Sequence, residues 1–383
     1  MITGSQNTDY ARGLEGVVAA ETRIGFVDGI NGRLVYRGYN IEELAELSTF
    51  EEVSYLLLYG KLPTKSEFAN FTSKLNADNH IDDQLFKILQ ECTKSSHPMS
   101  ALRTAVSYLG AMDKSSNKSD LTSQEAMGLR LMGKFPSIVA AINRAQQGKP
   151  LIRSNEPNYT VRFLEESFGK KPTEFETKVF RTALILHADH GMNASTFASM
   201  VTISTLSDMY SAVTSAIASL KGPLHGGANE QALDLLERIG SPKNADKVIT
   251  DMLEKKEKIM GFGHRVYKVY DPRAKILKGY AKKLAEDKGH SELFETAEEV
   301  EKVMINKLGT KGIFPNVDFY SGIVYKSLGF DPTLFTPIFA LSRISGWFAR
   351  SFEYLHDNRL FRPRSMYKGE VGPLKYVPIA DRK

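Results

Sequence analysis

Helix-forming sequence dominates this chain and leaves little room for other structure. From Asn40 onward, apolar residues recur at helical spacing, and residues typical of helix starts and ends separate the runs. The only clear strand pattern lies between Thr22 and Gly38, where two short apolar stretches flank a turn that contains Asp-Gly and Asn-Gly. We therefore predict an all-α fold with one small β-hairpin near the N-terminus.

End signals place the predicted helices. Thr64 and Glu67 have the spacing of a capping box, and Asn40 is placed to cap a helix over 41–47. The run 211–220 is apolar nearly all round, which predicts burial between other helices. The remaining predicted helices cover residues 51–59, 81–93, 98–113, 123–147, 174–190, 194–205, 208–220, 246–258, 271–287, 291–308 and 334–355.

The residue composition of the predicted helices changes along the chain, and this change indicates two domains. With 383 residues and 42% hydrophobic content, the chain can bury a substantial core. Residues 244–309 carry amphipathic helices rich in Lys and Glu, as expected of a smaller and more solvent-exposed domain. We predict a large domain over 1–222, a small domain over 223–330, and completion of the large domain by 331–383, which ends in a tail.

Composition narrows the functional classes. The net charge of +5 is spread along the chain, and we find neither Cys/His finger spacing nor a long arginine run, which argues against nucleic-acid binding and favours a basic cleft for an anionic ligand. The single Cys92 excludes an internal disulfide and suits a reducing compartment. No apolar run approaches membrane-spanning length, and the first residues lack a signal-peptide core, so we expect a cytoplasmic protein.

The segment Lys221–Glu230, KGPLHGGANE, is the strongest candidate for a functional turn. It puts His225 between a Gly-Pro turn and a Gly-Gly pair that can open a helix from Ala228. At the positive end of a helix dipole, an imidazole should stay neutral and offer an N–H to an oxygen. A glycine-rich connection with an ordinary surface histidine is the alternative for this segment alone.

Further polar residues stand in glycine-rich or apolar surroundings. In GFGHRVY, glycines again precede a histidine, His264, as they surround His225. Arg273 follows near a helix start and is either an anion ligand or a plain surface arginine. In PNVDFYSG, an apolar setting should raise the pKa of Asp318 and make it a usable base, unless it only caps a helix. Arg343 and Arg362 lie in apolar or turn-forming segments and are further candidates for anion binding.

His187 and His190 are three residues apart on one helix face, a spacing that could hold a metal. No third ligand or HExxH-like motif accompanies them, so we predict no metal site. Neutral histidines, a carboxylate in an apolar setting and several arginines suit a different chemistry. They fit proton abstraction beside a carbonyl, an enolate held by hydrogen bonds, and a multiply anionic partner held by arginines.

At these motifs the chain resembles citrate synthases. GPLHGGANE, GFGHRVYKVYDPRA, PNVDFYSG and RPRS are highly specific in combination, and the resemblance runs from about Gly13 to the C-terminus in the short form typical of archaea and many bacteria. It implies condensation of acetyl-CoA with oxaloacetate and water to give citrate and CoA, as in the tricarboxylic acid cycle. It also implies a two-domain all-α fold that closes over the substrates, an intertwined homodimer, and no cofactor besides the co-substrate acetyl-CoA.

The resemblance further implies roles for individual residues. Asp318 would take a methyl proton from acetyl-CoA, His225 would hydrogen-bond the thioester oxygen, and His264 would donate to the oxaloacetate carbonyl. The oxaloacetate carboxylates would be held by His190, Arg273, Arg343 and Arg362, the last of these from the other subunit. The residues near CoA would be Gly261, Phe262 and Gly263 at the adenine and Lys311 at a phosphate.

One departure from the family pattern and three alternatives remain. Where the family often has histidine three residues after a tryptophan, this chain has Arg350. A 2-methylcitrate synthase would share all these residues, because one methylene in a pocket is worth only about 1–3 kcal/mol. A catalytically silent acyl-CoA-binding protein is less compatible with the retained Asp318, His225 and His264, and a metallohydrolase built on His187 and His190 would lose activity in chelator.

Overall fold

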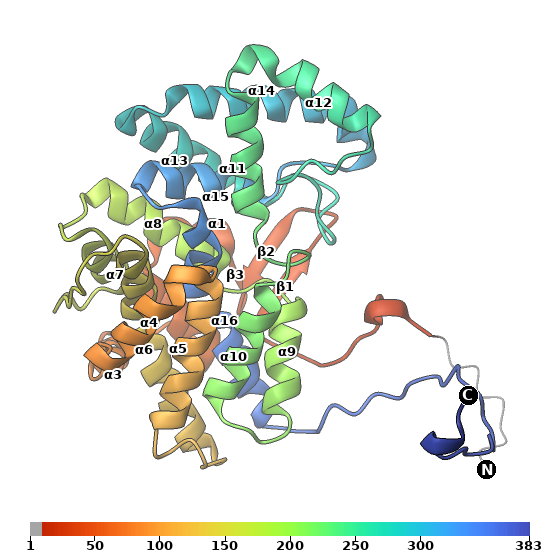
Figure 1. Cartoon of the computed structure of the whole chain (residues 1–383). Helices are drawn as coiled ribbons and strands as arrows, with labels where there is room; N and C mark the ends of the chain where they lie inside the picture. The colour runs from red at the N-terminus through yellow and green to blue at the C-terminus, as the bar shows by residue number, and fades with distance from the viewer. Residues whose placement is uncertain (1–9) are drawn as a thin grey trace.

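The computed structural model describes residues 10–383, and these form sixteen α-helices and one three-stranded sheet (Figure 1). The all-α prediction is confirmed. The helices are α1 (Ile41–Leu47), α2 (Phe50–Tyr59), α3 (Lys65–Asn76), α4 (Asp83–Ser95), α5 (Pro98–Met112), α6 (Leu121–Gln146), α7 (Tyr159–Phe168), α8 (Glu174–His187), α9 (Ala194–Ile203), α10 (Met209–Leu220), α11 (Ala228–Ile239), α12 (Ala245–Glu254), α13 (Pro272–Lys288), α14 (Ser291–Leu308), α15 (Val317–Leu328) and α16 (Phe335–Leu355).

The sheet contains the predicted hairpin and one short addition. Strands β1 (Gly25–Asp28) and β2 (Arg33–Tyr36) pair antiparallel, and β3 (Tyr39–Asn40) extends the sheet by two residues. In the turn, the backbone N–H groups of Ile30 and Asn31 donate to the Asp28 carboxylate at 3.0 Å, which fixes the reversal of the chain.

Local capping explains several helix starts. The Thr64 hydroxyl accepts from the Glu67 backbone, and the Glu67 side chain accepts from the Thr64 backbone, so the predicted capping box is present in both directions. The prediction for Asn40 was half right. It occupies the N-cap position of α1, but its side chain caps nothing and instead accepts from Arg33 at 3.4 Å.

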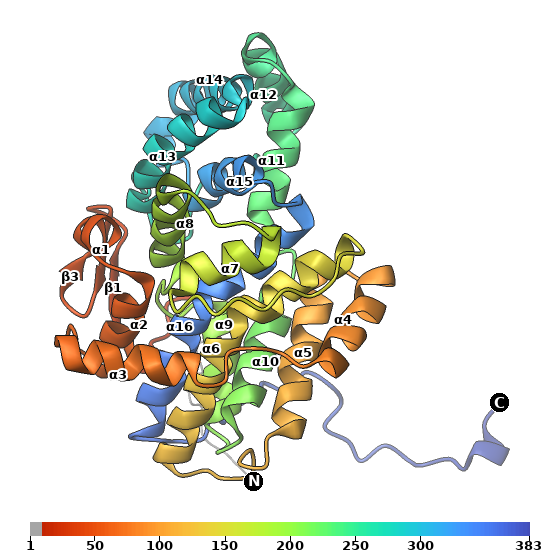
Figure 2. The same cartoon turned by 90° about the vertical axis from the view of Figure 1, so that its left-hand side faces the viewer.

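The long helix α16 is the centre of the lower body in Figure 1. It is buried along nearly its whole length and packs against α2, α6, α8, α9 and α10. Helices α11–α15 pack on one another and form a separate group, with α8 and α1 contacting its helix α13 (Figures 1 and 2). The chain passes from the first group to the second between α10 and α11, and it returns between α15 and α16. Both connections lie where the two groups meet.

Two helices and one helix end differ from the predictions. The sequence patterns do not predict α7 and α15, and α8 was predicted to continue to His190 but ends at His187. Residues 188–191 form a turn instead, because the Asp189 carboxylate is bound to an arginine of α16 and Gly191 has a positive φ of 64°. The turn puts His190 outside the helix and beside the junction of the two groups.

The C-terminal segment leaves the body after α16 (Figures 1 and 2). The Asn358 side chain donates to the Ser204 carbonyl at 3.1 Å, and Phe361 stacks on Tyr354 at 4.9 Å between ring centroids. From Arg362 onward the chain is exposed. Among the described helices, none is both long enough and apolar enough to cross a membrane.

Candidate active site

A large cavity of about 1190 Å³ lies between α16 and the group α11–α15. It is lined by residues of β1, the turn after α8, the starts of α11, α13 and α15, and one face of α16. Segments that are far apart in the chain therefore meet there. Of the predicted site residues, those that line the cavity are His190, His225, Gly263, His264, Arg273, Asp318 and Arg343.

The glycines around His225 permit a very tight connection between α10 and α11. A methyl group on Gly226 would lie 2.1 Å from the carbonyl oxygen of Leu220, so no side chain fits there. Gly227 has a φ of 79°, and α11 begins at Ala228 as predicted. The turn thus holds the His225 imidazole beside the first turn of a helix and at the edge of the cavity.

The protonation of His225 follows from its neighbours. The backbone N–H of Ser195 donates to Nε2 at 3.2 Å, so Nε2 carries no proton and a neutral ring has its proton on Nδ1. The Ser195 hydroxyl lies 2.8 Å from Nε2 and also accepts from the Trp347 indole N–H at 3.0 Å. Burial, and secondly Arg343, lower the pKa of His225 to about 4. The neutral state agrees with prediction, but burial rather than the helix dipole is its main cause.

His264 has the complementary tautomer. Gly261 and Gly263 have φ values of 82° and 78°, and the ring beyond them accepts at Nδ1 from the backbone N–H groups of Val266 at 3.0 Å and Tyr267 at 3.1 Å. The proton of the neutral ring is therefore on Nε2. Burial, and secondly Arg273, lower the pKa of His264 to about 4. Each histidine thus offers one N–H donor without a positive charge.

His187, the last residue of α8, and His190, in the turn that follows, have different surroundings. His190 lines the cavity, with Nε2 3.2 Å from the Tyr267 hydroxyl, and burial together with Arg273 lowers its pKa well below the usual range. His187 is fully buried, and its Nδ1 lies 2.7 Å from the Ala183 carbonyl oxygen, to which it donates. Within residues 10–383, no three His, Cys, Asp or Glu side chains lie close enough to hold a metal ion together.

Two buried arginines line the cavity with N–H groups to spare. Arg273 forms a fork with both carboxylate oxygens of Asp271, at 3.1 and 2.8 Å. The Arg343 Nε donates to the His187 carbonyl at 2.6 Å, and its guanidinium lies 4.5 Å from the centre of the Phe339 ring. Among the described residues, nothing accepts a hydrogen bond from Nη1 of Arg273 or from either Nη of Arg343. Buried guanidinium groups left in this way indicate an anionic ligand.

Asp318 lies in the first turn of α15, after the cap residue Asn316. Its carboxylate accepts no hydrogen bond from any residue in 10–383, and Asn316 instead links the loop to Gly263 through a 3.0 Å bond from its side chain to the carbonyl. Burial raises the pKa of Asp318 to about 6, against the opposing effect of Arg273. Desolvation was the predicted cause, and a carboxylate of this kind is a competent general base near neutral pH.

Sequence reasoning missed the residues that hold these groups in place. Ser195 fixes the tautomer of His225 and Asp271 forks with Arg273, yet neither was singled out. A signal existed for Asp271, because Asp-Pro before an arginine-containing helix is a typical N-cap. Nothing in the local sequence of Ser195 pairs it with His225.

Four predicted residues do not line the cavity. Gly261 and Phe262 are buried behind it, where the Phe262 ring lies 4.7 Å from Phe319. Lys311 is exposed in a single 3₁₀ turn, and Arg362 is exposed on the C-terminal segment. Their predicted contacts with CoA, and that of Arg362 with a neighbouring subunit, stay predictions.

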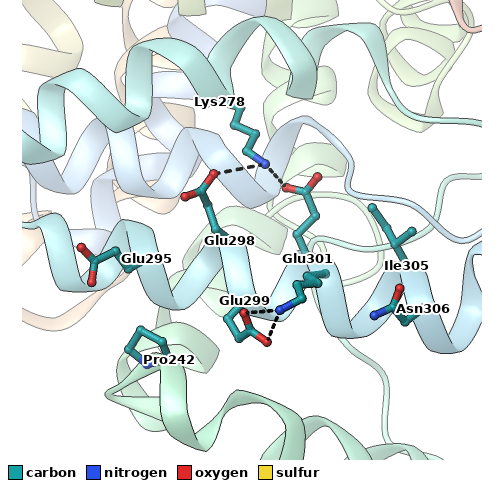
Figure 3. Close-up of a pocket in the computed structure, with 9 residues that line it drawn as sticks. Pro242, Lys278, Glu295, Glu298, Glu299, Glu301, Ile305 and Asn306 are labelled. Atoms are coloured by element: carbon teal, nitrogen blue, oxygen red, sulfur yellow. Dashed lines mark hydrogen bonds and ion pairs between the residues drawn. The ribbon is translucent and has the colours of Figure 1, made fainter.

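A second cavity of about 600 Å³ lies between α13, α14 and the turn before α12 (Figure 3). Two lysines face four glutamates in its lining: Lys278 reaches Glu298 at 3.5 Å and Glu301 at 3.0 Å (Figure 3), and Lys302 reaches Glu299 at 3.2 Å. It shares no residue with the cavity that holds the histidines. It also holds none of the predicted site residues, seven of which line the larger cavity.

Comparisons with known proteins agree with this site. The family model described as citrate synthase, C-terminal domain, matches residues 13–364. A citrate synthase of Deinococcus radiodurans is 48% identical and covers 98% of this chain and 100% of its own length, and a 2-methylcitrate synthase of Shewanella oneidensis is 41% identical with 97% of each chain covered. The solved ternary complex of carboxymethyl coenzyme A and oxaloacetate with Thermoplasma acidophilum citrate synthase has a TM-score of 0.92 at 39% identity, covering 98% and 100% of the two chains. This chain belongs to the citrate synthase family.

Proposed function

We propose that this protein is a citrate synthase, an acyltransferase that condenses acetyl-CoA with oxaloacetate and water to give citrate and CoA. The main support is one cavity that combines a carboxylate of raised pKa with two neutral histidines whose N–H donors are on different ring nitrogens. Such a set can remove a proton beside a carbonyl while donating hydrogen bonds to two oxygens.

In the proposed first step, Asp318 takes a proton from the acetyl methyl group and His225 donates its Nδ1–H to the thioester oxygen. The methyl group is roughly 15 pKa units less acidic than a carboxylic acid, which makes a free enolate about 20 kcal/mol uphill at 1.36 kcal/mol per unit. Asp318 cannot supply that alone. The His225 hydrogen bond and a cavity closed to water must share the deficit.

In the second step, the enolate carbon attacks the oxaloacetate carbonyl carbon while His264 donates its Nε2–H to the carbonyl oxygen. The thioester of the product is then hydrolysed by water, which releases citrate and CoA. The two carboxylates of oxaloacetate would bind His190, Arg273 and Arg343, whose spare N–H groups support this assignment. Arg362 of the partner subunit would complete the site in a homodimer.

The proposed domains give this chemistry a means of closure. Arg273 belongs to the predicted small domain (223–330) and Arg343 to the large domain (1–222 with 331–383), so one dicarboxylate can bridge them. CoA would lie along Gly261, Phe262 and Gly263, with Lys311 near a phosphate. No cofactor is proposed besides acetyl-CoA as co-substrate, and the single Cys92 supports a cytoplasmic location.

The second candidate is 2-methylcitrate synthase, favoured by the Shewanella oneidensis relative. The two activities differ by one methyl group on the acyl chain. Measuring kcat/KM for acetyl-CoA and propionyl-CoA with oxaloacetate tests both proposals. A clear preference for acetyl-CoA supports citrate synthase, a preference for propionyl-CoA supports the second candidate, and no turnover of either rejects both.

A further inference from the structure

Arg350 lines the cavity from α16, two helical turns after Arg343. Only 2% of its side chain is exposed, and its partner Asp189 is completely buried. Nε and Nη2 of Arg350 donate to Oδ1 and Oδ2 of Asp189 at 2.7 and 2.8 Å, which is a two-point fork. Asp189 directly precedes His190 in the sequence, so the ion pair is attached to the same turn as this cavity-lining histidine.

The turn that contains Asp189 is held from several sides. The Tyr36 hydroxyl donates to the Asp189 carbonyl at 2.7 Å and lies 3.1 Å from its N–H. A methyl group on Gly346 would lie 2.3 Å from the Ala188 carbonyl oxygen, and one on Gly25 would lie 2.8 Å from Asp189 Oδ2. The backbones of α16 and β1 therefore approach the turn as closely as glycine allows, and the ion pair closes this packing.

A contribution to folding stability does not by itself explain a buried ion pair such as Asp189 with Arg350. Removing two charges from water costs several kcal/mol per ion, and a well-packed apolar pair is often as stable or more stable. Burial, the largest single effect, would raise the pKa of Asp189, but Arg350 together with Arg343 and the Gly191 N–H holds it below its usual value. Nη1 of Arg350 has no hydrogen-bond acceptor among residues 10–383. The ion pair thus places two fixed charges beside the proposed oxaloacetate site and leaves the Nη1 group of Arg350 as a free donor among the described residues.

We propose that Asp189 and Arg350 are a positioning pair for oxaloacetate. Their two hydrogen bonds fix the turn after α8. This turn directs the His190 ring to the cavity, and the end of the helix before it directs the His187 carbonyl to Arg343. Two residues that would hold the dicarboxylate are set by this one anchor. The inference rests on the proposed function, and Arg350 is the position at which this chain departs from the family pattern.

The test uses Arg350→Gln and Asp189→Asn in the full-length protein. Glu353→Gln is the matched control. Glu353 is on the same helix as Arg350 and pairs with Arg37 at 3.5 Å, but it does not line the cavity. For each variant, calorimetry gives the oxaloacetate Kd, kinetics give kcat and the KM of both substrates, and thermal unfolding gives Tm. We expect both variants to raise the oxaloacetate Kd by about tenfold or more, the cost of one lost charge-assisted hydrogen bond, while the acetyl-CoA KM stays unchanged. Glu353→Gln should change neither constant.

A folded variant with an unchanged oxaloacetate Kd would overturn the inference, even with a lower Tm, because the pair would then serve stability only. Equal rises in the KM of both substrates would overturn it as well. If the single variants fail to fold, Asp189→Asn/Arg350→Gln leaves no uncompensated charge, and its amide pair should still raise the oxaloacetate Kd because it lacks the charged fork. Wild-type protein that binds no oxaloacetate would instead reject the proposed function.

Discussion

Replacing Asp318 by asparagine should abolish condensation and also change how stability depends on pH. An amide cannot accept the methyl proton, so turnover should fall by at least about 10²–10⁴-fold, the usual contribution of a positioned general base. Oxaloacetate binding should persist, because Asp318 has no hydrogen bond to the arginines proposed to hold that substrate. Activity and calorimetric binding of the variant measure these two expectations.

The effect on stability follows from the raised pKa. A pKa of about 6 in the folded protein, against 3.8 for an ordinary aspartate, corresponds to about 3 kcal/mol at 1.36 kcal/mol per unit. The folded state keeps the proton up to about pH 6 and the unfolded state loses it near 3.8, so ionisation destabilises the fold. Stability is lost as the pH rises between these two values and is constant above them. Because the side chain is partly accessible to solvent, about 3 kcal/mol is an upper limit.

Asparagine does not titrate, so the variant should lack this loss. Denaturant unfolding followed by circular dichroism, at pH values below 4 and above 6, gives the difference in unfolding free energy between variant and wild type. We expect this difference to favour the variant more at the higher pH, by up to about 3 kcal/mol. A difference that does not change with pH would refute the desolvated state of Asp318, and near-normal turnover would remove it from the mechanism.

Three further predictions concern the same site. The value of kcat/KM should fall as the pH drops through about 6, because Asp318 then holds a proton, and a flat profile across that range would exclude it as the base. Oxaloacetate alone should compact the protein, since Arg273 and Arg343 lie on different predicted domains; an unchanged scattering profile would contradict the hinge. Arg362→Ala and His264→Ala should each be nearly inactive as pure dimers, but refolding them together should restore roughly a quarter of wild-type activity, because about half the dimers are mixed and hold one intact site. No recovery, with mixed dimers confirmed by mass, would show that Arg362 serves its own chain.

Elements with local causes could be predicted from the sequence. The capping box at Thr64 and the helix start at Ala228 depend on residues within a few positions, and both are present. The end of α8 could not be predicted, because it depends on an ion pair between residues 161 positions apart. Gly191 gives a local sign that the helix ends nearby, but nothing in the sequence pattern pairs Asp189 with Arg350.

The site shows the same division. The direction of the pKa shift of Asp318 could be predicted, because its apolar neighbours in sequence are also neighbours in space. The tautomer of His225 could not, since the N–H that determines it comes from Ser195, thirty residues earlier on α9. From the sequence Arg273 could also be a surface arginine, and only the structure shows that it is buried with Asp271 and lines the cavity.

Trp347 is the only tryptophan in the chain, and its indole N–H donates to the hydroxyl that also contacts the His225 ring. A single buried indole, one hydroxyl away from a cavity histidine, is an intrinsic fluorophore. Excitation at the red edge of its absorption avoids the tyrosines, so the emission reports this one place. Binding of each substrate, and the order in which they bind, can then be followed in stopped-flow experiments on the unlabelled protein.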